Sequence, residues 1–282
     1  MKKHLSNILL VLVFLVGLGV LLYPTISDYW NSRVQSRAIV DYESALASLT
    51  QEDYSEAFRQ ADDYNAALRG VAYPLMYFDT LDAREDLLPY EDILNIKGNG
   101  IIGYIDIDAI GVELPIYHGV SDTVLQKGAG HLPGSALPIG GKGNHCILTG
   151  HTGLPSAELF TDLTELAVGD QFELHVLDEV LVYAVDQITV VLPHEADALE
   201  AVTGRDYCTL VTCTPYGINS HRLLVRGERV SAGEEAVLRQ EVEAPDGRVP
   251  LPAELIAAGT FVLLLLAAGG WVLLRKDKEG LQ

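Results

Sequence analysis

Short runs of apolar and β-branched residues, separated by glycine, proline and polar residues, recur through the chain from Gly103 onward. Runs of this length and composition predict β-strands, and their regular recurrence predicts a mainly β domain, built as a barrel or a sandwich. The pattern alone does not distinguish these two architectures. The predicted strands cover residues 104–107, 112–117, 146–149, 172–176, 180–192, 207–212 and 223–225.

Two longer apolar runs lie near the ends of the chain. Residues 8–23 carry no charged side chain and follow Lys2 and Lys3, as in a signal anchor or a cleaved signal peptide. We favour the anchor because a helical pattern begins soon after Pro24. Residues 255–274 are uncharged, and at about 1.5 Å per residue they span roughly 30 Å, the thickness of a bilayer core. This second run is the stronger candidate for a transmembrane helix.

Basic residues flank each apolar run on the side nearer its own terminus, because Arg275, Lys276 and Lys278 follow the second run directly. By the positive-inside rule, both termini are expected in the cytoplasm and the domain between the two spans outside the cell.

Residues 29–68 lack glycine and proline and are rich in Ala, Glu, Gln and Arg, which predicts one or two helices before the β-rich region. Residues 50–53 have the composition of a helix cap that divides them. The chain has 39 acidic and 19 basic side chains, so it offers no basic surface for phosphates and nucleic acid is not an expected partner.

Three side chains at the ends of predicted strands form a candidate active site. Cys213 ends the apolar run TLVTC, His151 follows the apolar run that ends at Thr149, and Arg222 begins the run after the Pro-Tyr-Gly-Ile-Asn turn. A thiol with an unperturbed pKa of about 8.5 is mostly protonated at neutral pH, so a nucleophilic cysteine needs a neighbouring base or positive charge. A histidine supplies this and can protonate a leaving amine, while an arginine suits an oxyanion or a substrate backbone. Each of the three residues also has a non-catalytic interpretation: Cys213 as a buried strand cysteine, His151 as a turn histidine and Arg222 as a surface charge.

The other two cysteines are read as small buried apolar residues. Cys208 and Cys213 lie five residues apart on one predicted strand, roughly 16 Å, which is too far for a disulfide. Cys146 and Cys208 could pair only if their strands are neighbours. A metal site made of His145, Cys146, His151 and a distant cysteine matches no zinc spacing, so we expect no metal.

The chain resembles the sortases, and among them the class C or pilin-polymerising sortases of Gram-positive bacteria. The resemblance rests on TLVTC ending at Cys213, TGHTGLPSAELFTDL around His151, HRLLVRGER with Arg222, and GYIDI followed by LPIYHG within residues 103–119. It covers residues 64–230. It implies a closed β-barrel of about eight strands with N-terminal helices, flanked by two transmembrane helices.

The resemblance also implies a reaction that needs no cofactor. Cys213 would be the nucleophile, His151 the general acid and base, and Arg222 would stabilise the oxyanion or the substrate. The enzyme would cleave a Leu-Pro-x-Thr-Gly-like (LPxTG) sorting signal of a secreted pilin subunit, hold the fragment as a thioester, and transfer it to a lysine amine of another subunit. The alternatives are a thiol hydrolase of the same signal and a non-catalytic membrane-anchored surface protein.

Together these expectations divide the chain into six parts. They are a cytoplasmic tip and anchor (1–27), helices with a possible lid (28–98), the catalytic barrel (99–232), a linker (233–254), a transmembrane helix (255–274) and a basic cytoplasmic tail (275–282).

Two segments depart from simple expectations. Class C sortases usually carry an Asp-Pro-aromatic lid motif, which this sequence lacks, although the apolar and aromatic residues 72–83 could cover a cleft. Leu251, Pro252 and Ala253 before the second apolar run imitate a sorting signal, but Glu254 and Leu255 stand at its Thr and Gly positions. We therefore expect a membrane anchor here and no cleavage site.

Overall fold

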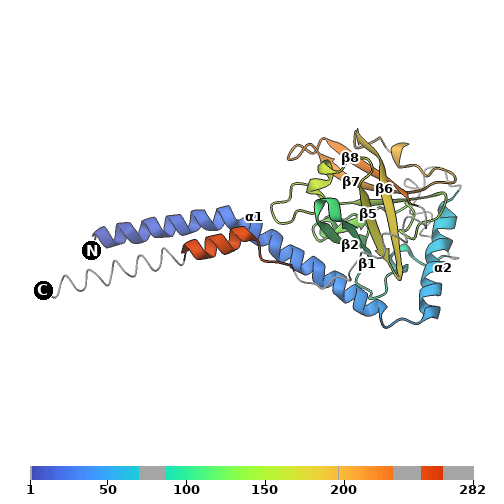
Figure 1. Ribbon diagram of the computed structural model, residues 1–282, viewed down its shortest axis with the longest axis horizontal. Coiled ribbons are helices and arrows are strands. Elements are labelled where there is room, and N and C mark those ends of the chain that lie inside the picture. The colour runs from blue at the N-terminus through green and yellow to red at the C-terminus, as the bar shows by residue number, and fades with distance from the viewer. Residues whose placement is uncertain (1, 70–86, 196, 231–248, 263–282) are drawn as a thin grey trace.

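The computed structural model describes residues 2–69, 87–195, 197–230 and 249–262, and Figure 1 shows a long helix running away from a compact β-domain. The predicted lid segment, residues 72–83, lies outside the described residues. Two helices precede the strands: α1 (Lys2–Leu46) and α2 (Gln51–Leu68). The short helices are α4 (Asp122–Leu125), η2 (Tyr90–Asp92), η3 (Asp108–Ile110), η4 (Thr161–Glu165) and η5 (Asp197–Leu199).

Eight strands close into a barrel in the order β1-β2-β3-β4-β7-β8-β6-β5. Their bounds are β1 Ile101–Ile107, β2 Val112–His118, β3 Ala129–His131, β4 Asn144–Thr149, β5 Gln171–Val176, β6 Glu179–Val191, β7 Asp206–Thr214 and β8 His221–Arg229. The β2–β3 and β4–β7 pairs are parallel, and the other pairs are antiparallel. The seven strands predicted from the sequence are all present. The additional strand is β3, which is too short to give an alternating pattern.

The barrel is filled by the side chains that alternate inward along each strand. On β7, Cys208 and Leu210 belong to the main core, whereas Val211 lies on the outer face in a smaller apolar cluster. Because side chains alternate along a strand, β4, β7 and β8 present one set of side chains to the barrel core and another set to the outside of the barrel.

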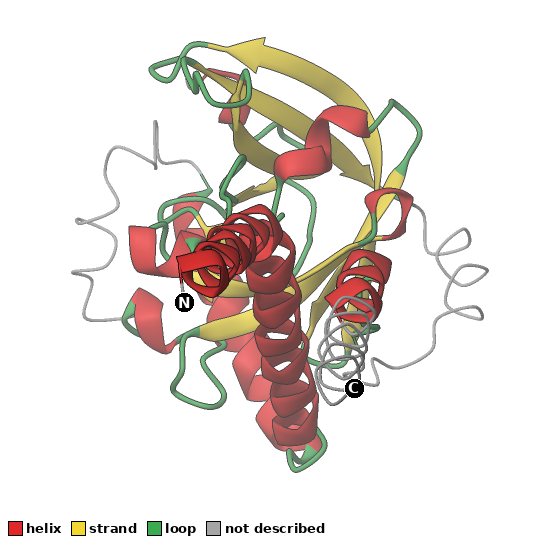
Figure 2. Ribbon diagram, turned by 90° about the vertical axis from the view of Figure 1, so that its left-hand side faces the viewer, coloured by secondary structure: helices red, strands yellow, loops and turns green. Residues whose placement is uncertain are grey.

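The predicted N-terminal helices pack against the barrel, because both contribute side chains to its core cluster. Figure 2 views the molecule from the N-terminal side of α1. Ile39, Tyr42 and Leu46 share one buried face of α1, and the Tyr42 hydroxyl accepts a 2.9 Å hydrogen bond from the Leu177 amide. Thr50 caps α2 in a capping box with Asp53, as the sequence predicts. Because α1 continues through Pro24, the anchor and the first predicted helix are one uninterrupted helix.

Among the described residues, one helix is long and apolar enough to cross a membrane. It is the part of α1 from Val11 onward, whose apolar window is not buried against any other described residue. The second predicted span extends beyond the described residues, and its described part is a shorter apolar helix, Ala253–Val262. The structure therefore supports one membrane anchor and leaves the second span a prediction.

Candidate active site

Cys213 lies one residue before the end of β7, directly across the ladder from Arg222 at the start of β8. Directly opposed residues of an antiparallel pair point to the same face of the sheet. Cys213 and Arg222 therefore share the outer face of the barrel, and both side chains are half-buried. This is the juxtaposition that the sequence predicted from the short turn between the two runs.

His151 reaches the same end of the barrel through the neighbouring strand. β4 pairs in parallel with β7, and Thr149 stands opposite Val211 at the end of the ladder. His151 follows two residues after Thr149, and Cys213 follows two residues after Val211. Because parallel neighbours run about 4.8 Å apart, this register places the two residues side by side.

Two hydrogen bonds extend the β4–β7 contact to the residue before His151. The Gly150 amide donates to the Val211 carbonyl at 3.0 Å, and the Thr212 hydroxyl donates to the Gly150 carbonyl at 2.8 Å. This role of Thr212 was not predicted, because a buried threonine on a strand gives no signal of it in the sequence. Its hydroxyl ties the backbone beside His151 to the strand that carries Cys213.

We define the His151 loop as residues 150–160. A Cβ on Gly150 would lie 2.5 Å from the Phe160 ring, so only glycine lets the two ends of this loop approach so closely. The Phe160 amide donates to the His151 carbonyl at 3.1 Å. At Gly153 (φ +71°) a Cβ would lie 3.1 Å from the ring of Tyr216, so this loop also touches the β7–β8 loop.

The Arg222 guanidinium bends toward the β7–β8 loop. Its Nη1 donates to the carbonyls of Asn219 and His221 at 3.3 and 3.1 Å. A guanidinium has five N–H donors in a fixed fork, so bonds from one nitrogen orient the group and leave other donors for a substrate.

An apolar patch continues from Cys213 along the outer face of the barrel. Ile147, Val211 and Leu224 form it, one from each of β4, β7 and β8, and Ala198 and Leu199 of the β6–β7 loop pack over it. A small cavity next to it is lined by Gln187, Thr189, Ala198, Thr209, Leu224 and Arg226. The face that carries the candidate nucleophile is thus apolar and partly covered.

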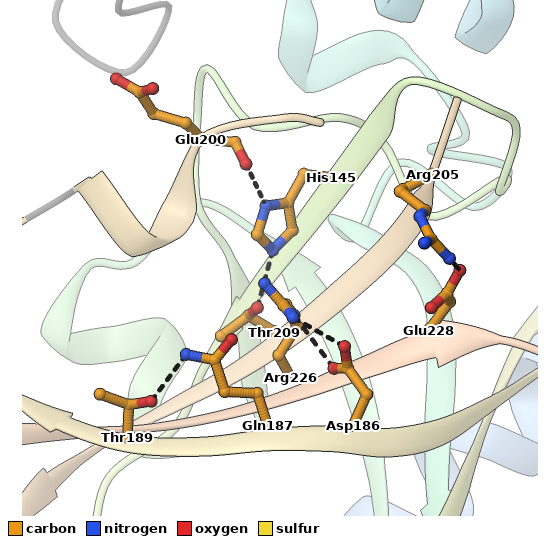
Figure 3. A network of polar contacts seen from close by, with 9 residues as sticks. All are labelled: His145, Asp186, Gln187, Thr189, Glu200, Arg205, Thr209, Arg226 and Glu228. Atoms are coloured by element: carbon orange, nitrogen blue, oxygen red, sulfur yellow. Dashed lines mark hydrogen bonds and ion pairs between the residues drawn. The ribbon is translucent and has the colours of Figure 1, made fainter. Parts of the chain in front are cut away.

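A polar network closes the far end of this patch (Figure 3). His145 Nδ1 donates to the Glu200 carbonyl at 3.0 Å, and its Nε2 lies 2.7 Å from the Thr209 hydroxyl. Burial lowers the pKa of His145 to about 4, so the ring is neutral and Nε2 accepts from Thr209. Arg226 makes a bidentate ion pair with Asp186, at 2.7 and 3.0 Å. The bond to Glu200 fixes the β6–β7 loop to β4, whereas the ion pair joins β8 to β6 within the barrel wall.

Cys146 and Cys208 are register partners on the adjacent strands β4 and β7, and both face the core. Their strands are therefore neighbours, which is the condition for pairing. In the structure both are buried free thiols, consistent with their reading as small apolar residues. His145 is on the outer face of β4 and Cys146 on the inner face, so the alternation separates two ligands of the metal site considered above.

The structure thus brings together Cys213, His151 and Arg222 at one end of the barrel. Their chemical roles remain a prediction, since the fold establishes their placement only.

Comparisons with known proteins agree with this fold. The family model described as a sortase domain matches residues 105–230. The crystal structure of sortase C1 from Streptococcus agalactiae is 45% identical, with a TM-score of 0.60, over 69% of this chain and 98% of that one. A Clostridium perfringens sortase C structure with the C-terminal cell wall sorting motif is 42% identical, with a TM-score of 0.59, over 69% and 98% of the two chains. Sortase A of Bacillus anthracis is 27% identical over 81% of this chain and 96% of its own.

The fold and these likenesses define a cysteine transpeptidase. The chain belongs to the sortase family, and its solved relatives place it among the class C sortases.

Proposed function

We propose that this enzyme cleaves an LPxTG-like sorting signal of a secreted pilin subunit and joins the fragment to a lysine amine of another subunit. The observation that carries the proposal is the register of three strands. It sets Cys213 opposite Arg222 and beside His151 at one end of the barrel. Two similar structures support the substrate, since one contains the C-terminal cell wall sorting motif and another is a pilus-related sortase C of Group B Streptococcus.

In the proposed reaction, the Cys213 thiol gives its proton to His151, the sulfur attacks the threonine carbonyl of the signal, and Arg222 donates to the oxygen on which negative charge develops. His151 protonates the glycine amine as the C–N bond breaks, which leaves a thioester on Cys213. His151 then takes a proton from the incoming lysine ammonium, and the amine displaces the sulfur. One amide is exchanged for another, so the cycle needs no nucleotide or metal.

We propose that the apolar patch of Ile147, Val211 and Leu224, which is buried under the β6–β7 loop in this structure, receives the apolar residues of the signal when that loop moves aside. It lies on the same face as Cys213, beginning two residues before it on β7. The β6–β7 loop above this patch would enclose the bound segment and exclude water, which favours an amine over hydrolysis.

The placement of the enzyme is part of the proposal. α1 would anchor it in the membrane with the N-terminus in the cytoplasm, and residues 255–274 would return the chain, with its basic tail, to the cytoplasm. The catalytic barrel would then stand outside the cell, where secreted subunits pass.

Incubation of the protein with a Leu-Pro-x-Thr-Gly peptide tests the reaction, with a Cys213→Ala variant as the control. Intact mass should show a covalent acyl adduct on the parent protein alone. Added lysine or pilin should convert that adduct to a peptide–amine product. An adduct that only hydrolyses would favour the thiol hydrolase. No adduct on an enzyme whose Cys213 still alkylates would reject this signal.

A further inference from the structure

Helix α1 touches the His151 loop at two points. The Asn31 side-chain amide donates to the Ser156 carbonyl at 2.6 Å, and the Glu158 amide donates to a carboxylate oxygen of Asp28 at 2.9 Å. Asp28 and Asn31 are three residues apart, so they lie on the same face of α1 about one turn apart. The partners in each contact are separated by at least 125 positions in the sequence.

These contacts reach His151 because the loop is closed on itself. The Phe160 amide bonds to the His151 carbonyl at 3.1 Å, and the Gly153 amide bonds to the Thr161 hydroxyl at 3.1 Å. Leu154 and Ala157 form a bridge across the middle of the loop. A shift of the segment that α1 holds would therefore be transmitted to the backbone of His151.

The contacts also lie just beyond the apolar part of α1. At about 1.5 Å per residue, Asp28 is roughly 8 Å along the helix from Tyr23, where the uncharged run ends. The helix that carries the candidate membrane anchor thus meets the barrel first at the loop next to the reacting groups.

We propose that Asp28 and Asn31 are positioning residues for the transfer reaction. Through these two residues, helix α1 fixes the His151 loop against the strand of Cys213. This rests on the proposed role of His151. The two residues do not touch the substrate in this proposal. They set the geometry of the acid and base, on which the rate of a proton transfer depends strongly.

The Glu158 side chain makes the contact between α1 and the His151 loop dependent on pH. It faces Asp162 and Glu165 of η4 and Asp28 of α1, all of them acidic. A hydrogen bond with Asp162, burial and the other carboxylates raise the pKa of Glu158 to about 7. The protonated form donates to Asp162, whereas the ionised form brings like charges together beside the two contacts.

The test compares variants of the full chain in detergent micelles, with Val34→Ala on the exposed side of α1 as the control. Asn31→Asp keeps the shape and removes the donor. Asp28→Ala removes the acceptor, whereas Asp28→Asn keeps one. We expect kcat for the sorting peptide to fall about tenfold or more in Asn31→Asp and Asp28→Ala, with KM within about twofold. Asp28→Asn and Val34→Ala should stay near the parent.

Hydrogen exchange over residues 152–160 reads the same contacts without activity. Protection should fall in Asn31→Asp and Asp28→Ala and stay unchanged in Asp28→Asn. Unchanged kcat in the first two variants would overturn the proposal, whether or not exchange rises. If the parent forms no acyl adduct, the proposed function fails first. Unchanged exchange in Asn31→Asp and Asp28→Ala would then reject the positioning contacts as well.

Discussion

Cys208 and Cys213 stand on the same strand, five residues apart, in opposite surroundings. Cys208 faces the barrel core with 0% of its surface exposed, whereas Cys213 is half-buried on the outer face, opposite Arg222. An odd separation on a strand puts the two thiols on opposite faces of the sheet. Cys213, on the outer face at the end of β7, is the one that lies beside His151. The same side chain is thus core filler at one position and candidate nucleophile at the other.

The largest difference between the two should appear on substitution. Cys213→Ala should lower transpeptidation on the order of 10³-fold or more, since it removes the group that forms the covalent intermediate. Cys208→Ala should lower the melting temperature through the cavity it leaves and keep kcat near that of the parent. Turnover of a sorting peptide and thermal unfolding measure the two effects. Comparable losses of turnover in both variants would contradict the contrast.

Alkylation of the native protein should separate the same two thiols by rate. Cys213 should react with a small reagent in the folded state, whereas Cys146 and Cys208 need an opening of the barrel. Because global unfolding populates a fraction of about 10⁻³ or less, their reaction should be slower by at least that factor. Peptide mapping after timed alkylation measures this. Three thiols should react after denaturation without reductant, and only one if Cys146 and Cys208 are disulfide-bonded.

The position of Cys213 at a strand end was predictable from the sequence, whereas the strand β3 and the contacts between α1 and the His151 loop were not. Alternation along residues 207–212 and the turn before Arg222 were enough to place Cys213 at a strand end. The strand β3 escaped because three residues, one of them Gly130, carry no period. The contacts of Asp28 and Asn31 were not predictable, because they join segments far apart in the chain and depend on how α1 crosses the barrel.

The outer-face partner of Cys213 gives the next prediction. Arg222→Lys keeps the charge and loses the planar fork that donates to the Asn219 and His221 carbonyls. We expect kcat to fall on the order of 10²-fold, as for the loss of an oxyanion donor, with alkylation of Cys213 little changed. Steady-state kinetics measure the loss. A rise in KM alone would assign Arg222 to substrate binding.

Thr212 should give a smaller effect through the backbone. Thr212→Val keeps the volume and removes the hydroxyl that donates to the Gly150 carbonyl, which leaves a buried acceptor at a cost of about 1–3 kcal/mol. We expect a lower free energy of unfolding and a loss of kcat of about fivefold or less. Denaturant unfolding and peptide kinetics check both. A stability loss without any change in kcat would limit Thr212 to the fold.

The smallest effect should come from the pH dependence at Glu158. Its pKa is raised to about 7 in the folded protein, so the folded state holds a proton that an ordinary carboxyl would lose near pH 4.5. The stabilisation this gives is complete below pH 4.5 and is lost as the pH rises through about 7. Glu158→Gln donates to Asp162 at every pH, so exchange protection of residues 152–160 should fall between pH 6 and 8 in the parent alone. Because Glu158 is largely exposed, screening keeps this change modest. Equal slopes in parent and variant would mean that another group titrates, and the acidic contact with α1 would then have no part in fixing His151.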